Sequence, residues 1–293
     1  MVNLGIDAFC WHARVAAKEV DILDILDVAA ELEVPFVQTT LDYVRPIPGG
    51  ADAVVARAEQ HGIKLQAHGA PIGRRYFDGD LDKAIAAVSE WLRETKQLGS
   101  PNLDVHSGVY RPELTADPNS YGDELDFLRR VLHGAADIAG ELELELLIEN
   151  ASDFKSDELL SLVGEDRSLP LGIFLDVTNS LNVWEDPLVA IERLAPLSVT
   201  GHVKDFALSS NWTSDHYHRR GYTVEFLYPG EGITDVAAHV GKLVELKSGS
   251  DYNLSIEGLD SRSGIDDQLV RLRPSVARVR ECLRAAETTL SAQ

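Results

Sequence analysis

The sequence predicts a (β/α)₈ barrel, an α/β fold in which parallel strands alternate with helices. Short apolar runs alternate with longer amphipathic stretches along the whole chain of 293 residues. The later apolar runs are nearly continuous, which is typical of parallel strands that are buried on both faces. The connections between successive runs have the lengths of βαβ crossovers. Eight such strand–helix units in a chain of this length are typical of a (β/α)₈ barrel.

The strands are expected where short apolar runs are bounded by glycine, proline or polar residues. These runs are residues 2–9, 34–40, 63–69, 101–108, 142–150, 169–176, 196–206 and 252–260. The helices are expected where apolar residues recur at helical spacing. These stretches are residues 19–33, 51–62, 81–99, 121–142, 156–164, 185–196, 233–247 and 264–290. Gly62 and Gly99 are natural C-terminal stops for two of them.

The pattern indicates a single domain over residues 1–293, without a linker. A doubly wound sheet is the alternative, but it normally has a glycine-rich phosphate turn after the first strand. Residues 6–14 contain no glycine. The one long interruption covers about residues 206–229 and is rich in aromatic residues and histidine. We expect this insertion to fold over the barrel mouth as a hairpin or lid.

The composition excludes several classes of partner. The formal net charge is −21, which disfavours nucleic acid and membrane surfaces because both are anionic. No apolar run is long enough to cross a bilayer, and the N-terminus lacks the pattern of a secretory signal. The two cysteines, Cys10 and Cys282, form no disulfide framework, so a reducing cytoplasm is expected. A homo-oligomer or a partner subunit is compatible with this composition.

Four consecutive predicted strands end in a residue that can bind a metal ion. These residues are Glu149, Asp176, His202 and Glu257. Functional groups of such barrels lie at the C-terminal ends of the strands, so we expect these side chains to converge. Buried carboxylates that lie close together require a cation. A set of oxygen ligands with one imidazole suits one divalent ion, with Mn²⁺ preferred and Mg²⁺ or Co²⁺ as alternatives, better than a structural zinc ion.

The chain resembles the xylose-isomerase-like barrel superfamily of sugar isomerases, epimerases and dehydratases, which also contains abasic-site endonucleases. The motifs that carry this resemblance are IEN at Glu149, LDVTNSL at Asp176, GHVKD at 201–205, YPGEGITD at 228–235 and IEG at Glu257. The resemblance implies that Glu149, Asp176, His202 and Glu257 are the metal ligands. It also implies that Glu149 and Glu257 are the acid/base pair of the isomerising members.

Other strand ends offer groups that could contact a substrate. The resemblance implies substrate or acid/base roles for His68 and His106, with His106 as a catalytic candidate. Lys204 is a further catalytic candidate, because it could polarise a substrate oxygen. Asn179 stands where ketose 3-epimerases usually have a substrate-contacting histidine. The remaining substrate-binding candidates, which lie at the barrel mouth and could stack on or bind a sugar, are Trp11, His12, Tyr43 and Tyr110.

The expected function is a metal-dependent isomerase or epimerase that acts on a keto-sugar or related polyol. A carboxylate removes the proton next to a carbonyl, and the metal stabilises the enediolate that forms. A lyase is the alternative, since the same groups can expel a β-substituent from an inosose or a 3-keto-glycoside. An abasic-site endonuclease and a non-catalytic accessory barrel are the remaining possibilities, and the net charge argues against the endonuclease.

Overall fold

The computed structural model describes residues 1–111, 118–164, 167–210, 222–258 and 265–292. Eight parallel strands form a closed barrel in the order β1-β10-β7-β6-β5-β4-β3-β2. The strands are β1 (Val2–Asp7), β2 (Phe36–Thr40), β3 (Lys64–Pro71), β4 (Asn102–His106), β5 (Glu145–Glu149), β6 (Leu171–Asp176), β7 (Ser198–Val203) and β10 (Tyr252–Ile256). The predicted fold class is therefore confirmed.

The barrel closes where the first strand pairs with the last. Val2 of β1 lies opposite Tyr252 of β10, and the register continues to Ile6 opposite Ile256. All six residues of β6 are buried, as expected for a strand that is covered on both faces. Because every barrel strand runs in the same direction, the C-terminal ends of all eight share one rim of the barrel.

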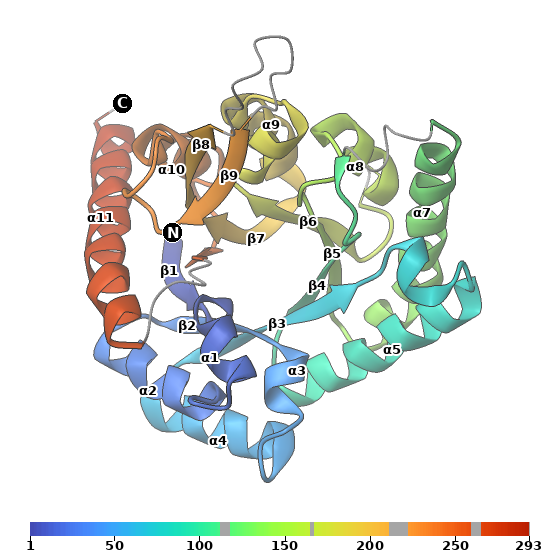
Figure 1. The fold of residues 1–293 in the computed structure, drawn as a ribbon, viewed down its shortest axis with the longest axis horizontal. Helices are drawn as coiled ribbons and strands as arrows, with labels where there is room; N and C mark the ends of the chain where they lie inside the picture. Colours follow the sequence, from blue (N-terminus) through green and yellow to red (C-terminus); the bar gives the residue numbers. More distant parts are fainter. Residues whose placement is uncertain (112–117, 165–166, 211–221, 259–264, 293) are drawn as a thin grey trace.

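Helices surround the barrel on the outside (Figure 1). The longer ones are α2 (Ile22–Glu31), α4 (Gly50–His61), α5 (Leu81–Gln97), α7 (Pro118–Glu141), α8 (Ser156–Val163), α9 (Pro187–Leu194), α10 (Val236–Leu246) and α11 (Ile265–Ser291). The short helical elements are η1 (Ala8–Trp11), α1 (His12–Ala16), α3 (Leu41–Val44), η2 (Arg74–Phe77), η3 (Asn179–Val183) and η4 (Ala195–Leu197). None of the described helices combines the length and the apolar character that a membrane span requires.

Local sequence signals set several of these helix boundaries. Asp21 begins α2 with a capping box, because its carboxylate accepts from the N–H groups of Leu23 and Asp24 and the Asp24 carboxylate accepts from the Asp21 N–H. Gly62 ends α4 with a φ of 67°, a left-handed conformation that glycine adopts without steric cost. Pro187 stands at the start of α9, where its missing N–H has no helical partner to lose.

An antiparallel hairpin follows the seventh barrel strand. It consists of β8 (Asp205–Ser210) and β9 (Tyr222–Leu227), which pair from Asp205 opposite Leu227 to Ser210 opposite Tyr222. The seventh strand therefore ends at Val203, and the predicted run to residue 206 already includes the first residues of the hairpin. The hairpin lies within the predicted insertion at about 206–229. Residues 211–221 lie outside the described part of the chain, and a lid function stays a prediction.

Candidate active site

The four side chains expected at consecutive strand ends lie together at the C-terminal rim. Glu149 and Asp176 are the last residues of β5 and β6, and Glu257 directly follows β10. His202 lies in β7 opposite Asp176. Its Nδ1 atom is 3.8 Å from Glu149 Oε1, 3.9 Å from Asp176 Oδ2 and 3.5 Å from Glu257 Oε2. Each of the four residues is at most 9% exposed, so the carboxylates face one another largely without water.

The geometry of this cluster fits a divalent cation. Among the described residues, His202 Nδ1 is buried and has no hydrogen-bond partner. Ligand atoms that each lie about 2.1 Å from one ion are roughly 3 to 4 Å apart, which matches the separations around Nδ1. Ligand atoms of Glu149, Asp176 and His202 all lie within 4.8 Å of one another. A buried imidazole nitrogen without a partner, surrounded by carboxylate oxygens, is a donor set for a metal ion.

Asp7 of β1 also belongs to this cluster, although sequence reasoning did not single it out. Its Oδ2 atom lies 3.0 Å from His202 Nε2, and Asp7, His202 and Glu257 form a second group of buried ligand atoms within 4.8 Å. Its Oδ1 atom accepts from the N–H of Phe9 and caps η1. The first strand was expected to reach residue 9, but it ends at Asp7. The apolar run that ends in Asp7 was the sequence signal that could have identified this residue as part of the cluster.

Lys204 is buried among the carboxylates and does not pair with the adjacent Asp205. Its ammonium lies 2.9 Å from Asp176 Oδ2 and forms an ion pair with Glu257 Oε2. It also lies 4.7 Å from the ring centre of Phe226 in β9, a cation–π contact. The side chain is 4% exposed, so its positive charge offsets two buried negative charges at short range.

The loop after β6 holds Asp176 and Glu149 in place. Asp176 Oδ1 accepts from the backbone N–H groups of Thr178 and Asn179, at 2.8 and 2.9 Å. Its other carboxylate oxygen therefore remains for Lys204 and for the space around His202. The Asn179 side-chain amide donates to Glu149 Oε1 at 3.1 Å. Asn179 thus orients a carboxylate of the cluster, while its own buried Oδ1 atom has no hydrogen-bond partner among the described residues.

Asp205 anchors the loop that follows the hairpin. Its carboxylate accepts from the backbone N–H groups of Phe206, Gly230, Gly232 and Thr234 and from the Thr234 hydroxyl, at 2.7 to 3.1 Å. A Cβ atom at Gly232 would lie 2.2 Å from the Phe206 carbonyl oxygen and 2.4 Å from Asp205 Oδ1. The GHVKD and YPGEGITD motifs therefore fold together as one structural unit beside the cluster.

His68 and His106 form the wall of the site on β3 and β4. Their rings stack with centroids 5.4 Å apart. His68 Nδ1 pairs with the fully buried carboxylate of Asp104. Burial opposes protonation of His68, but the charge of Asp104 outweighs it and raises the pKa of His68 to about 9. Burial and the charge of His68 lower the pKa of His106 to about 4. At neutral pH the two rings therefore differ in charge.

A cavity of 350 Å³ opens beside this cluster. The described residues that line it are Asp7, Phe9, His12, Thr40, Asp42, Tyr43, His68, Gly69, Ala70, Pro71, His106, Glu149, His202 and Glu257. His12 Nδ1 lies 2.9 Å from the Tyr43 hydroxyl, and the His12 ring lies 4.5 Å from that of Phe9. These aromatic groups form a wall on which the C–H face of a sugar ring could pack. The cavity lies in the size range of small-molecule sites.

Three of the predicted substrate contacts, Trp11, Tyr110 and Asn179, are not among the described residues that line this cavity. Trp11 is 1% exposed and packs in the hydrophobic core, because the turn of η1 directs its side chain inward. Tyr110 lies in the loop after β4, is 58% exposed and is not among the described lining residues. Their roles as substrate contacts stay predictions. His12, Tyr43, His68 and His106 do line the cavity.

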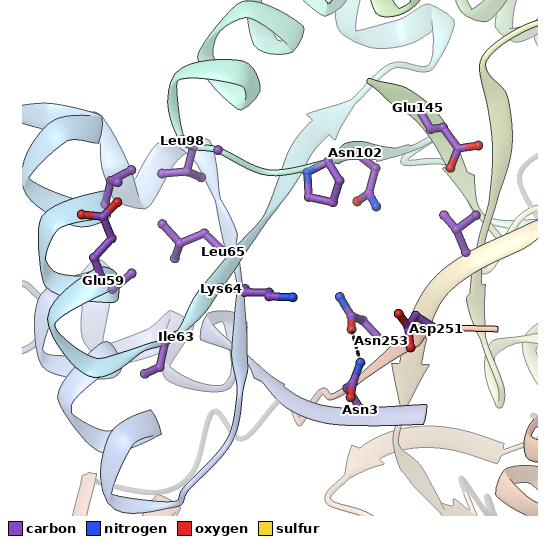
Figure 2. A pocket seen from close by; sticks show the side chains of 15 residues that line it. Asn3, Glu59, Ile63, Lys64, Leu65, Leu98, Asn102, Glu145, Asp251 and Asn253 are labelled. Carbon is purple, nitrogen blue, oxygen red and sulfur yellow. Dashed lines mark hydrogen bonds between the residues drawn. The ribbon is translucent and has the colours of Figure 1, made fainter. Parts of the chain in front are cut away.

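A second hollow, of 470 Å³, lies at the opposite end of the barrel, where the strands begin. Figure 2 shows Lys64 directed into it and Asn3 bonded to Asn253. Three of its four charged residues, Glu59, Lys64 and Asp251, are exposed, and the fourth, Glu145, is partly buried. The clusters of potential metal ligands found among the described residues lie at the other end of the barrel. The C-terminal rim is therefore the candidate active site, as the fold leads one to expect.

Comparisons with known proteins agree with this fold. A family model described as a xylose isomerase-like TIM barrel matches residues 26–283. The chain is 24% identical over 206 residues to the uncharacterized protein YihM of Escherichia coli (strain K12). That match covers 69% of this chain and 58% of the relative, so the chain spans less than two thirds of the relative's length.

Solved structures extend the likeness over nearly the whole chain. The structure of an L-ribulose 3-epimerase has a TM-score of 0.71 and 16% identity, and the match covers 100% of this chain and 98% of that one. The 3-keto-D-glucoside 4-epimerase YcjR of E. coli has a TM-score of 0.70 and 15% identity, with 96% and 100% covered. At these identities the likeness concerns the fold.

Proposed function

This chain belongs to the xylose isomerase-like TIM barrel family, and on that premise we propose that it is a divalent-metal-dependent isomerase or epimerase of an uncharged keto-sugar. The observation that carries the proposal is the cluster of Glu149, Asp176 and Glu257 oxygens around the unpartnered Nδ1 of His202. Similarity to solved sugar epimerases supports the reaction class. Mn²⁺ is the preferred ion, because the donor set is mostly oxygen with one imidazole.

The bound ion would polarise the carbonyl of the sugar and stabilise the enediolate. Glu149 ends β5 and Glu257 directly follows β10, so the two carboxylates approach His202 from different strand ends. One carboxylate removes the proton next to the carbonyl, and the electron pair of the broken C–H bond moves toward the carbonyl oxygen. For an epimer, the other glutamate enters the step protonated and gives its proton to the opposite face of the same carbon. For an isomer, the glutamate that removed the proton returns it to the former carbonyl carbon, and the hydroxyl proton of the enediol passes to the other oxygen.

The charge of the cavity supports an uncharged substrate. Its lining contains the carboxylates of Asp7, Asp42, Glu149 and Glu257, and positive charge comes from histidine, because no lysine or arginine is among its described lining residues. A sugar phosphate or a uronic acid would bring more negative charge to these groups. The aromatic wall of Phe9, His12 and Tyr43 suits the C–H face of a neutral sugar ring. Free keto-sugars and 3-keto-glycosides are therefore the preferred substrates.

The pair of His68 and Asp104 favours a second candidate, a β-eliminating lyase. Burial lowers the pKa of His68, but the negative charge of Asp104 raises it to about 9. His68 therefore holds a proton at neutral pH. A protonated imidazole on the cavity wall could donate its proton to a departing oxygen. The C–H bond would break as before, and the C–O bond to the β-substituent would break with it. The product would be an unsaturated ketone together with the released alcohol or water.

One experiment tests both candidates. The Mn²⁺-loaded protein is incubated in D₂O with uncharged ketoses, inososes and 3-keto-glycosides, and the sugars are followed by NMR. Deuterium at the carbon next to the carbonyl of recovered sugar supports the isomerase, whereas an unsaturated product supports the lyase. Glu149→Gln and Glu257→Gln should each slow turnover by about 10²-fold to 10⁴-fold. Full turnover in both variants would contradict the acid/base assignment.

A further inference from the structure

Gln38 connects the candidate metal cluster to the cavity wall. It lies in β2 and is fully buried. Its side-chain N–H donates to Asp104 Oδ1 at 3.0 Å. Its carbonyl oxygen lies 2.7 Å from His202 Nε2 and accepts from the Ser255 hydroxyl at 2.8 Å. The amide thus reaches a carboxylate on one side and a histidine on the other.

The Asp104 carboxylate determines which way this amide faces. A carboxylate can only accept hydrogen bonds, so the nitrogen of Gln38 must point toward Asp104 and its oxygen toward His202. The opposite orientation would place a carbonyl oxygen against a carboxylate and the side-chain N–H₂ group against the Ser255 hydroxyl and His202. Since all three partners of Gln38 are buried, water cannot compensate for the wrong orientation.

The orientation of Gln38 in turn determines the tautomer of His202. An amide oxygen accepts but does not donate, so His202 Nε2 must carry the hydrogen. Asp7 Oδ2, 3.0 Å from the same nitrogen, favours the same arrangement. In a neutral ring the lone pair then resides on Nδ1, the atom that faces Glu149, Asp176 and Glu257. A metal ion requires that lone pair.

Asp104 acts on a second ring at the same time. Its Oδ2 atom pairs with His68 Nδ1, while its Oδ1 atom accepts from Gln38. That pairing leaves Nε2 as the His68 ring atom available to a ligand in the cavity that His68 lines. One buried carboxylate thereby orients a cavity histidine directly and the cluster histidine through an amide.

We infer that Gln38 and Asp104 are positioning residues: Gln38 sets the tautomer in which His202 can bind a metal ion, and Asp104 fixes Gln38 and the ring of His68. This inference rests on the proposed metal-dependent function. It assigns distinct roles to the two residues, so that their substitutions have separable effects. Loss of Gln38 disturbs His202, and loss of the Asp104 charge disturbs His68.

Gln38→Met removes the hydrogen bonds to Asp104, His202 and Ser255 and keeps the length of the side chain. Gln66→Met is its matched control, because Gln66 is equally an amide on a neighbouring barrel strand, is 1% exposed, and bonds to the Thr200 hydroxyl instead. Mn²⁺ affinity is measured by titration calorimetry of the metal-free proteins. Gln38→Met should weaken binding about 10-fold to 100-fold, the usual effect of losing an outer partner of a ligating histidine. The Mn²⁺ affinity of Gln66→Met should stay within about threefold of the wild-type affinity, because Gln66 does not contact a ligating histidine.

A second readout does not depend on the metal. In ¹⁵N-histidine NMR of the metal-free proteins, at a pH high enough for the His202 ring to be neutral, wild type and Gln66→Met should hold the hydrogen on Nε2. Gln38→Met should show a larger fraction of the Nδ1–H tautomer than either protein, although Asp7 still favours the hydrogen on Nε2. Unchanged affinity and tautomer in Gln38→Met would overturn the inference. If the wild type bound no divalent cation, the proposed metal function would fail, but the tautomer comparison would still decide the role of Gln38.

Asp104→Asn supplies the complementary test. The new amide oxygen can still accept from Gln38, so the His202 tautomer should persist. The charge beside His68 is lost, and the pKa of His68 should fall from about 9 toward or below its ordinary value, as followed by NMR titration. A His68 titration that did not move would contradict the role of Asp104. If Gln38→Met fails to fold, this variant still tests the part of the inference that assigns Asp104 to His68.

Discussion

The ammonium of Lys204 lies 2.9 Å from Asp176 Oδ2 and also pairs with Glu257, two of the carboxylates that face His202 Nδ1. A buried cation on the protein itself therefore shares ligands with the ion that the cluster could bind. Buried carboxylates that close to one another repel unless positive charge offsets them. Lys204 supplies part of that charge in the absence of a metal ion.

This relationship predicts that Lys204→Met makes stability depend on metal. Removing one partner of a buried ion pair costs about 3–5 kcal/mol, because the remaining charges are left uncompensated. We expect a loss of that order in urea denaturation with a chelator present, and a smaller loss with Mn²⁺. Lys242→Met is the control, since Lys242 pairs with the 55%-exposed side chain of Glu245 one helical turn away. Equal stability of wild type and Lys204→Met without metal would contradict the prediction.

The sequence predicted the barrel and most of its rim because those signals are local. An apolar run followed directly by Glu149, Asp176 or Glu257 marks a strand end regardless of what packs beside it. Once the fold class is known, shared strand direction brings those ends together. Asp7 was missed because apolar residues follow it, so the predicted strand ran on to residue 9 although β1 ends at Asp7.

The remaining features depend on side-chain directions inside a closed barrel. Gln38 and Asp104 are 66 residues apart, and their contact follows from the inward orientation of both side chains. No local pattern distinguishes an inward amide that bonds to a histidine from one that bonds to a hydroxyl. Trp11 is a second example, since its place near a strand end suggested a sugar contact, whereas the structure places its side chain in the core after the short helix η1.

Asp205→Ala should destabilise the protein far more than Asp235→Ala. Asp205 accepts from several N–H groups of the loop that follows the hairpin, and its loss leaves these buried donors unsatisfied. Asp235 caps α10 through one bond, from the Ala238 N–H. We expect a loss of at least about 3 kcal/mol for the first variant and about 1 kcal/mol for the second, in equilibrium denaturation. Similar losses would show that Asp205 is not an anchor.

Two glycine substitutions should change stability in opposite directions. A Cβ atom at Gly232 would lie 2.2 Å from the Phe206 carbonyl oxygen, so Gly232→Ala forces the backbone apart. A Cβ atom at Gly241, inside α10, has nothing within 4 Å. Gly232→Ala should lower the free energy of unfolding by about 1–3 kcal/mol, and Gly241→Ala should raise it by about 0.5–1 kcal/mol. A stabilising Gly232→Ala would refute the close packing of this loop against the hairpin.

Asp153 should make the protein less stable as the pH rises. Its carboxyl is fully buried, pairs with the Ser107 hydroxyl and accepts from the Phe154 N–H at 2.6 Å. Burial raises its pKa to about 7, above the value of an unfolded chain. The folded state then binds a proton that the unfolded state has released, so stability falls between about pH 4 and pH 7 and stays low above it. The full difference is about 4 kcal/mol.

Asp153→Asn removes this titration and keeps an oxygen that can accept from the Phe154 N–H. The variant should gain stability relative to the wild type on going from pH 5 to pH 8, because the wild type alone must carry a buried charge at the higher pH. Urea denaturation gives the change in the free energy of unfolding between pH 5 and pH 8 for each protein, and the effect is the difference between these two changes. That comparison cancels the titration of every group that the two proteins share, so an identical pH dependence would mean that Asp153 titrates at its ordinary pKa.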